Sequence, residues 1–261
     1  MAIVDIVTYN GEVDLLKLRL AVLDQFVDEF VVVEAQRTFS GIKKPLYFRY
    51  TDFNNQKIRY NIIDEPHAEQ KYGQIADASP NVPVNGPKHW RREFIQKEAI
   101  KDALTYLKDD DVCFVGDVDE IWNEEALNAQ LHRKLKLKVY TYYLNNRSTE
   151  EFWGTIKTDY KTIKEGCLNH LRTFLPKTDM EFGWHFTSMG GYNEMFRKMM
   201  HSYTSDSYSN DAVILNLKQN MTNNRDFLGR NFKYRCDESE WPTYLKEHRT
   251  EYEHLCKEVG E

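Results

Sequence analysis

The first 35 residues alternate a strand, a helix and a second strand, and this alternation is the strongest constraint on the fold. The runs IVDIVTY (3–9) and EFVVVEA (29–35) are largely apolar and β-branched, as strands buried on both faces are. Between them, apolar residues recur at steps of three and four over residues 12–27, which predicts an amphipathic helix. A helix that joins two neighbouring strands in this way makes them parallel. We therefore predict an α/β chain with a mixed, mostly parallel sheet flanked by helices.

The remaining sequence predicts further strands and helices, with a less regular and more aromatic second half. Residues 64–88 are rich in proline and lack periodicity, so they are expected to form a long loop, either a lid or a flexible segment. The other expected strands cover residues 57–63, 109–115, 139–146, the segment around 171–175, and 182–191. The other expected helices cover residues 88–108, 123–137, 192–202 and 241–258, with one more after residue 210.

Composition excludes several classes of protein. The net charge of −6, without a cluster of Lys and Arg, argues against binding to nucleic acid. No basic, apolar leader opens the chain, and no window approaches 18 uncharged apolar residues, so we expect no secretion signal and no transmembrane segment. The 4 cysteines are scattered without metal-ligand spacing, as reduced thiols of a cytoplasmic protein would be. The expected localisation is cytoplasmic.

The most informative motif is the acidic cluster in VCFVGDVDEIW (112–122), which directly follows a buried strand. On extended backbone, Asp117 and Asp119 point to one side, with Glu120 on the other. In open α/β sheets, ligands bind at the carboxyl ends of the strands, and two carboxylates sharing one side repel unless a cation lies between them. The pair therefore indicates a site for Mg²⁺ or Mn²⁺, which bind hard oxygen ligands. The alternative is a solvated acidic turn, or a cap at the entry of a helix.

Four blocks follow one another along the chain: YNGEVDLLKLRLAVLDQFVDEFVVVEAQRTFSGIKKPLYF, HWRREFIQKEAI, DDDVCFVGDVDEI, and GWHFTSMGG followed by Glu194 and the helix MFRKMM. In sequence and in order, these blocks resemble the family 17 glycosyltransferases. The similarity covers roughly residues 3–235. It implies a GT-A type (Rossmann-like) fold and an inverting, metal-dependent transfer of a sugar from a nucleotide-diphosphate donor to a glycan or polysaccharide. UDP and N-acetylglucosamine are favoured as the nucleotide and the sugar.

The resemblance also implies how the chain is divided. We expect a single GT-A-like domain over residues 1–261, without an internal repeat or a low-complexity linker. Within it, residues 1–122 would bind the nucleotide sugar and residues 123–235 would form the aromatic, acceptor-side half. Residues 236–261 would add a C-terminal helix.

The resemblance assigns the donor site to residues at the ends of the first strands. Asp117 and Asp119 are expected to hold Mn²⁺ or Mg²⁺ and the diphosphate, with Asp117 also counted among the donor contacts. The residues expected to contact the nucleoside are Thr8, Asn10, Glu12 and Glu34. For Glu34, which would accept hydrogen bonds from ribose or uracil, the alternative is a surface carboxylate at a strand end.

Two further donor contacts are predicted outside the strand ends. Of the neighbours Arg91 and Arg92, one would bind the diphosphate with two parallel hydrogen bonds, and Arg92 is favoured. Trp184, together with Trp153, would form an apolar wall for a sugar ring, or else would be a core residue.

Inverting transfer needs a base that takes the proton of the acceptor hydroxyl. The block GWHFTSMGGYNE offers Glu194, in the first turn of a helix after a Gly-Gly turn, and His185, on an aromatic strand. The alternatives are a carboxylate favoured by the helix dipole for Glu194, and for His185 a core residue, a metal ligand or a phosphate contact.

The chain departs from the family pattern in one place. Bacterial relatives carry Ser-Phe-x-His-x-Glu after this helix, whereas residues 202–207 read Ser-Tyr-Thr-Ser-Asp-Ser. If the missing His is a metal ligand in those relatives, His201 or Asp206 replaces it here or the metal is coordinated differently; Asp206 is also an alternative base. Two other classes of function stay open: a sugar-nucleotidyltransferase-like enzyme, which a single glycine near the first strand disfavours, and a sugar-nucleotide-binding module without activity.

Overall fold

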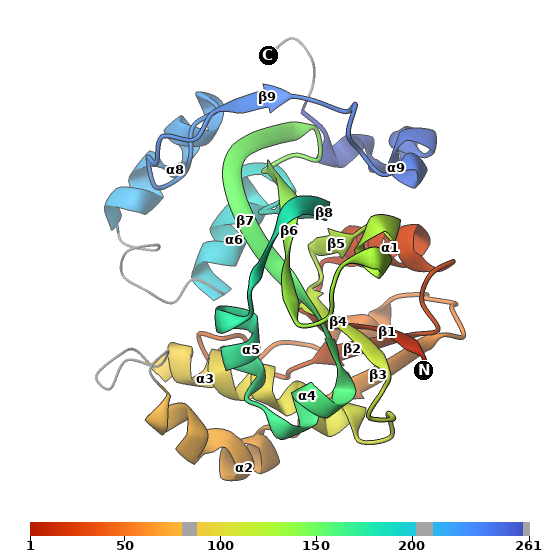
Figure 1. The fold of residues 1–261 in the computed structure, drawn as a ribbon. Coiled ribbons are helices and arrows are strands. Elements are labelled where there is room, and N and C mark those ends of the chain that lie inside the picture. The colour runs from red at the N-terminus through yellow and green to blue at the C-terminus, as the bar shows by residue number, and fades with distance from the viewer. Residues whose placement is uncertain (80–87, 202–210, 258–261) are drawn as a thin grey trace.

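A mixed sheet of nine strands forms the centre of the molecule in the computed structural model, which describes residues 1–79, 88–201 and 211–257 (Figure 1). The strand order is β3-β2-β1-β4-β7-β6-β8-β5, and β9 pairs with β7 outside this path. The strands are β1 Ile3–Tyr9, β2 Glu29–Glu34, β3 Ile58–Ile62, β4 Val112–Asp117, β5 Glu120–Trp122, β6 Arg133–Thr141, β7 Asn146–Asp159, β8 Lys177–Thr187 and β9 Tyr234–Cys236.

The first four strands form a parallel half-sheet whose order reverses between β1 and β4. The chain moves outward from β1 to β2 and β3, and then returns to place β4 on the other side of β1. Such a reversal opens a crevice at the carboxyl ends of the two central strands, because their connections leave in opposite directions. Beyond β4, the pairings β4–β7, β7–β6 and β8–β5 are antiparallel and only β6–β8 is parallel.

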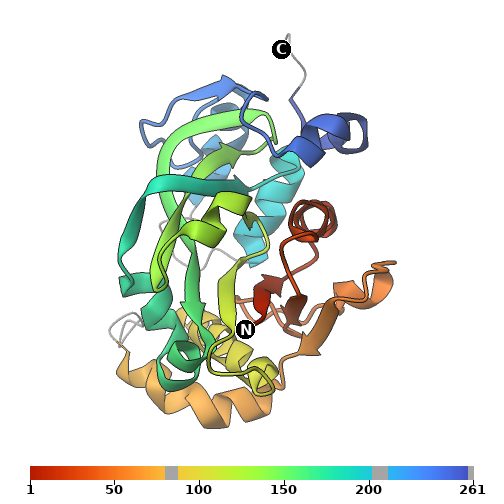
Figure 2. The same cartoon turned by 45° about the vertical axis from the view of Figure 1, so that its right-hand side comes forward.

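Helices cover both faces of the parallel strands (Figures 1 and 2). On one face, alternate β-strand residues such as Ile6 pack against α2 (Glu65–Ala78) and α3 (Lys88–Glu98). On the other face, residues such as Val7 pack against α1 (Val13–Leu23). The predicted mixed α/β sheet flanked by helices is therefore confirmed. It is not mostly parallel, because four of the eight strand pairings in the described residues are parallel and four are antiparallel.

The remaining helices surround the second half of the sheet. They are α4 Tyr160–Glu165, α5 Leu168–Phe174, α6 Gly191–His201, α8 Asp211–Thr222 and α9 Thr243–Glu247. None of the helices within the described ranges is long and apolar enough to cross a membrane.

Three predictions of local structure were wrong. Residues 65–78, expected to be loop, form α2, because the proline at residue 66 occupies the first turn, where its missing N–H is not needed. Residues 133–137, expected to be helical, belong to β6, whose buried side chains alternate with period two. Residues 171–174, expected to be a strand, lie in the short helix α5.

Two predicted helices are shorter than expected. The helix expected over 88–108 is α helical only to Glu98 and continues as a 3₁₀ helix over Ala99–Leu104. The helix expected over 241–258 is likewise divided, into α9 and a 3₁₀ helix over Arg249–Leu255. Each break falls where i to i+3 hydrogen bonds replace the α-helical pattern, as is common near helix ends.

Candidate active site

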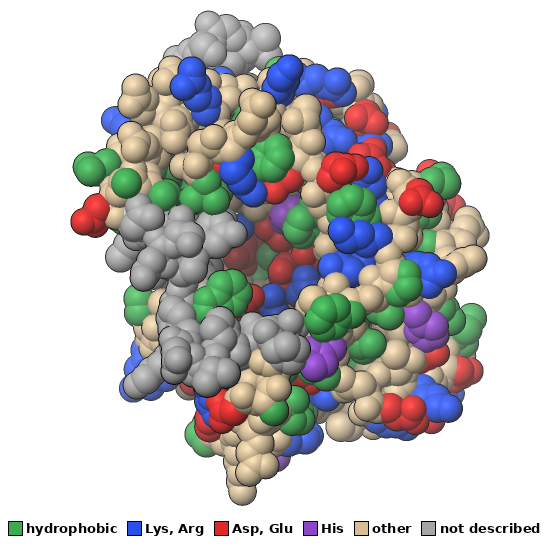
Figure 3. Space-filling model, turned by 60° about the vertical axis from the view of Figure 1, so that its left-hand side comes forward, with side chains coloured by type: hydrophobic (Ala, Val, Ile, Leu, Met, Phe, Trp, Pro, Cys, Tyr) green, Lys and Arg blue, Asp and Glu red, His purple; other side chains and the backbone are tan. Residues whose placement is uncertain are grey.

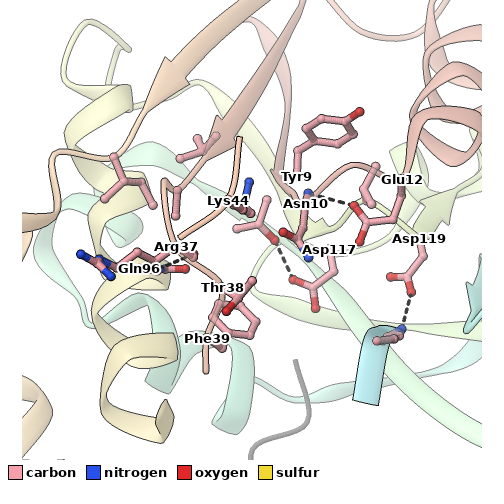
Figure 4. Close-up of a pocket in the computed structure, with 16 residues that line it drawn as sticks. Tyr9, Asn10, Glu12, Arg37, Thr38, Phe39, Lys44, Gln96, Asp117 and Asp119 are labelled. Carbon is pink, nitrogen blue, oxygen red and sulfur yellow. Dashed lines mark hydrogen bonds and ion pairs between the residues drawn. The ribbon is translucent and has the colours of Figure 1, made fainter. Parts of the chain in front are cut away.

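The crevice between β1 and β4 brings together polar residues that are more than 100 positions apart in the sequence. Thr8 and Asp117 are direct neighbours in the parallel register, and the Thr8 hydroxyl donates to Asp117 Oδ1 at 3.0 Å. Both residues line a pocket that we call the strand-end pocket (Figure 4). Its other lining residues include Asn10, Glu12, Phe39, Lys44, Asp119 and Lys198.

A buried arginine donates hydrogen bonds to the main chain of residues 117–120, which we call the acidic turn. Arg19 of α1 donates to both carboxylate oxygens of Asp5 at 2.7 Å, and both side chains are inaccessible to solvent. Its remaining nitrogen donates to the main-chain oxygens of Asp117 at 3.2 Å and of Glu120 at 2.6 Å. Trp122 adds a hydrogen bond to Asp5 at 2.8 Å. The acidic residue in the middle of the first strand therefore orients the arginine that holds the 117–120 turn.

A second arginine, absent from the sequence-based prediction, engages Asp117 directly. Arg172 of α5 donates to its two carboxylate oxygens at 2.9 and 3.3 Å, and to Glu120 Oε1 at 3.0 Å. Burial opposes a charge on Asp117, but the cations of Arg172 and Lys97 outweigh it and hold the pKa of Asp117 well below its ordinary value. Asp117 is therefore ionised.

Asp119 enters the strand-end pocket beside Asp117, as predicted, although a turn rather than extended backbone carries it there (Figure 4). Lys198 Nζ lies 3.5 Å and His185 Nε2 3.6 Å from Asp119 Oδ2. Burial again opposes the charge, and these two groups lower the pKa of Asp119 below its ordinary value. Figure 3 shows acidic side chains gathered at the floor of a hollow, with basic ones beside them.

Glu120 is buried behind Asp117 in space made by two glycines. A Cβ atom at Gly116 would lie 2.7 Å from Glu120 Oε2, and one at Gly154 would lie 2.5 Å from Glu120 Cδ. The carboxylate accepts hydrogen bonds from the Asp117 N–H at 3.1 Å and from Arg172. Burial raises the pKa of Glu120, and Arg172 only partly offsets this. Glu120 therefore holds the guanidinium of Arg172 in place. It begins the strand β5, so the alternative that the acidic cluster caps the start of a helix does not apply to Glu120.

Asn10 and Glu12 lie at the end of β1, at the rim of the same pocket. The Asn10 N–H donates to Glu12 Oε2 at 2.8 Å. Burial, with a contribution from the charge of Asp119, raises the pKa of Glu12 above its ordinary value. Thr8, Asn10 and Glu12 are thus brought together with the acidic pair, as the sequence led us to expect.

Protein groups bind the carboxylate of Glu34, for which a contact with the donor is predicted, and Glu34 is not among the residues that line the strand-end pocket. Glu34 is fully buried and accepts hydrogen bonds from Lys44 Nζ at 2.6 Å, from the Tyr60 hydroxyl at 2.8 Å and from two backbone N–H groups. Lys44, which it orients, is the member of this pair that lines the strand-end pocket.

Arg92 and Trp184, for which donor contacts are also predicted, make hydrogen bonds within the protein and do not line the strand-end pocket. Arg92 donates to the main-chain oxygen of Phe39 at 2.7 Å, which anchors the loop after β2, and its neighbour Arg91 pairs with acids on α2. Trp184 is buried in the main core and donates to the main-chain oxygen of Glu240 at 2.6 Å. The cations that lower the pKa of Asp117 come from α3 and α5.

The two candidate bases lie in different surroundings. Glu194 is half exposed in the first turn of α6, pairs with Arg197 at 2.7 Å, and lines a cavity of about 560 Å³ that we call the α6 pocket. Asp119 lines this pocket too. His185 stacks on Phe152, with ring centroids 3.9 Å apart, and is mostly buried. Its Nδ1 finds no hydrogen-bond partner in the described part of the chain.

The replacement residues proposed for the family mismatch cannot be placed. Asp206 lies outside the described residues, and only the backbone of His201 is described, as the last residue of α6.

The donor chemistry of the strand-end pocket fits a hard divalent cation that is shared with a ligand. Asp117 and Asp119 supply ionised carboxylate oxygens to one pocket. Over the ranges that the structure describes, no group of three or more His, Cys, Asp or Glu side chains is arranged to hold a metal by itself. Mg²⁺ and its relatives are commonly held by one or two carboxylates plus substrate phosphates and water. The site therefore fits a metal that binds together with a phosphorylated ligand.

The fold and the site are those of open α/β proteins, which bind their ligands in the crevice where the strand order reverses. The family model for glycosyltransferase family 17 matches residues 1–219, and the chain belongs to this family.

Two relatives are named beta-1,4-mannosyl-glycoprotein 4-beta-N-acetylglucosaminyltransferase. The human protein is 30% identical over 178 residues, which are 63% of this chain and 30% of the relative. The rat protein is 30% identical over 178 residues, 63% of this chain and 29% of its own length. The chain thus spans about 30% of the length of these relatives.

Proposed function

We propose that the protein is an inverting, metal-dependent glycosyltransferase of GT-A type, which moves N-acetylglucosamine from UDP-N-acetylglucosamine to a hydroxyl of a glycan. The observation that carries this proposal is the pair Asp117 and Asp119, ionised and side by side at the reversal between β1 and β4, in a member of glycosyltransferase family 17. The names of the similar proteins support the choice of sugar.

In the proposed mechanism, the strand-end pocket receives the nucleoside beside Thr8 and Asn10. Asp117 and Asp119 would hold Mn²⁺ or Mg²⁺, which neutralises the negative charge of the leaving diphosphate. Arg172 and Lys97 add positive charge next to Asp117. Glu194 accepts the proton of the acceptor hydroxyl as its oxygen bonds to the anomeric carbon and the bond from that carbon to the diphosphate breaks.

Calorimetric titration of UDP, with and without Mn²⁺, tests the donor site. We expect UDP to bind with Mn²⁺ and much more weakly without it. Mn²⁺ alone should bind weakly, because in the described ranges no three His, Cys, Asp or Glu side chains are arranged to hold the ion. GDP and CDP serve as controls for the base. UDP binding that is equally tight without a divalent ion would contradict the role of Asp117 and Asp119.

Glu194→Gln is expected to leave UDP affinity unchanged and to lower turnover by roughly 10²–10⁴-fold, the usual contribution of a general base. The substitution keeps the size of the side chain and removes the group that accepts the proton. Steady-state transfer rates and calorimetry on the same preparation measure the two effects. Glu124→Gln, at an exposed position in the first turn of another short helix, is the matched control and should behave as the wild type. If Glu194→Gln keeps full turnover, Glu194 is not the base, and His185 is the next candidate.

A further inference from the structure

A second cavity adjoins the strand-end pocket at Asp117. We call it the aromatic pocket; it measures about 330 Å³ and lies between α3, β7 and α5. Asp117 lines both cavities. A ligand whose phosphates lie at Asp117 can therefore extend from one cavity into the other, with its two ends in different chemical surroundings.

The walls of the aromatic pocket combine rings with hydrogen-bonding groups. The rings are Trp90, Phe94, Phe152 and Trp153. Trp153 is fixed in place, because its indole N–H donates to the main-chain oxygen of Thr178 at 2.9 Å. Apolar faces with a few polar groups at fixed positions are what a pyranose ring requires, since it has both C–H faces and equatorial hydroxyls.

Charged side chains mark the boundary between the two cavities. Arg172 contacts Asp117 and lines the aromatic pocket, and Lys97 lies on the same side, paired with Glu93 at 2.7 Å. Lys97 also approaches the ring of Phe39, a residue of the strand-end pocket, at 5.9 Å. Two cations thus border the path that a diphosphate would take from one cavity to the other, where its charge needs compensation.

Three cavities adjoin the acidic pair. The strand-end pocket measures about 140 Å³, and the other two differ from each other in size. The aromatic pocket, at about 330 Å³, lies near the lower limit for small-molecule sites, as suits one sugar ring. The α6 pocket is larger, at about 560 Å³, and holds Glu194. We propose that the aromatic pocket binds the sugar ring of the donor, while its nucleoside lies in the strand-end pocket and the α6 pocket receives the acceptor. This inference rests on the proposed function.

Thr173→Trp tests the inference by filling the mouth of the aromatic pocket from an exposed position on α5. The affinities of UDP and of UDP-N-acetylglucosamine are measured by calorimetry in the presence of Mn²⁺. We expect the affinity for UDP to be unchanged and that for the sugar nucleotide to fall by roughly tenfold or more, because only the latter needs the filled space. Thermal unfolding checks that the variant is folded.

Two other variants complete the design. Thr173→Val keeps the cavity open and removes a hydroxyl that donates within its own helix, to the main-chain oxygen of Asn169 at 2.7 Å, so it should lose far less affinity for the sugar nucleotide than Thr173→Trp does. Arg197→Trp narrows the α6 pocket and should leave both donor affinities unchanged.

Three results would overturn the inference. They are an equal loss of affinity for UDP and for the sugar nucleotide in Thr173→Trp, no loss of affinity for either ligand in that variant, or a loss of affinity for the sugar nucleotide alone in Arg197→Trp. The failure of the wild type to bind UDP would instead overturn the proposed function itself.

Discussion

Asp119→Asn is expected to lower kcat/KM for sugar transfer by at least roughly 100-fold, which corresponds to about 2.7 kcal/mol of transition-state stabilisation. The substitution preserves the size of the side chain and removes one of the two ionised carboxylates in the strand-end pocket. The loss should appear together with the loss of Mn²⁺-assisted UDP binding, because both depend on the same cation. Initial rates of transfer and calorimetry with UDP and Mn²⁺ measure the two quantities.

The control for this prediction is Asp24→Asn, at a half-exposed aspartate that follows α1 and pairs with Lys57 at 3.7 Å. It changes the net charge equally and should retain wild-type rates. Asp119→Asn with unchanged kcat/KM and an unchanged response to Mn²⁺ would exclude the acidic pair from metal binding.

Arg19→Met is expected to lower the free energy of unfolding by about 3–5 kcal/mol, the usual cost of removing one partner from a buried ion pair. Asp5 would be left buried with its charge uncompensated, and the main-chain oxygens of Asp117 and Glu120 would lose a donor. Since these oxygens belong to the acidic turn, the folded fraction should also bind UDP and Mn²⁺ more weakly. Urea denaturation measures the first effect and calorimetry the second.

Arg59→Met is the comparison, because Arg59 forms an exposed ion pair with Glu29. We expect it to lower the free energy of unfolding by only about 0–1 kcal/mol. The double variant Asp5→Asn with Arg19→Met should recover part of the loss, because it removes the buried charge as well. If Arg19→Met lowers the free energy of unfolding by less than about 1 kcal/mol, the ion pair of Arg19 with Asp5 does not stabilise the turn at residues 117–120.

The parallel half of the fold could be predicted because its signals are local. The strands at residues 3–9 and 29–35 and the helix between them are visible in hydrophobic periodicity alone. The errors arose where a local signal was ambiguous. The prolines near residues 64–88 indicated a loop, although one of them stands in the first turn of α2. The helix predicted over residues 123–137 combined a short 3₁₀ helix, Glu124–Asn128, with the alternating residues that begin β6.

For the candidate site, too, some residues could be predicted from local signals and others could not. Thr8, Asp117 and Asp119 were predictable, because the end of a strand can be recognised in the sequence and parallel strands of one sheet end at the same edge. Glu34 and Trp184, also predicted to contact the donor, do not line the strand-end pocket, and their hydrogen bonds to Lys44 and Glu240 could not be foreseen from the sequence. Arg172 could not be found, because no pattern links it to an acidic cluster 55 positions earlier in the chain.

By itself, the sequence determined the parallel strands, the position of the acidic pair at a strand end, and the family. Only the tertiary structure decided which cations face that pair, and that three cavities meet around it. The physical reason is the range of the interactions: periodicity and strand ends depend on neighbours along the chain. The contacts of Arg19 and Arg172 join segments that only the packed sheet brings within hydrogen-bonding distance.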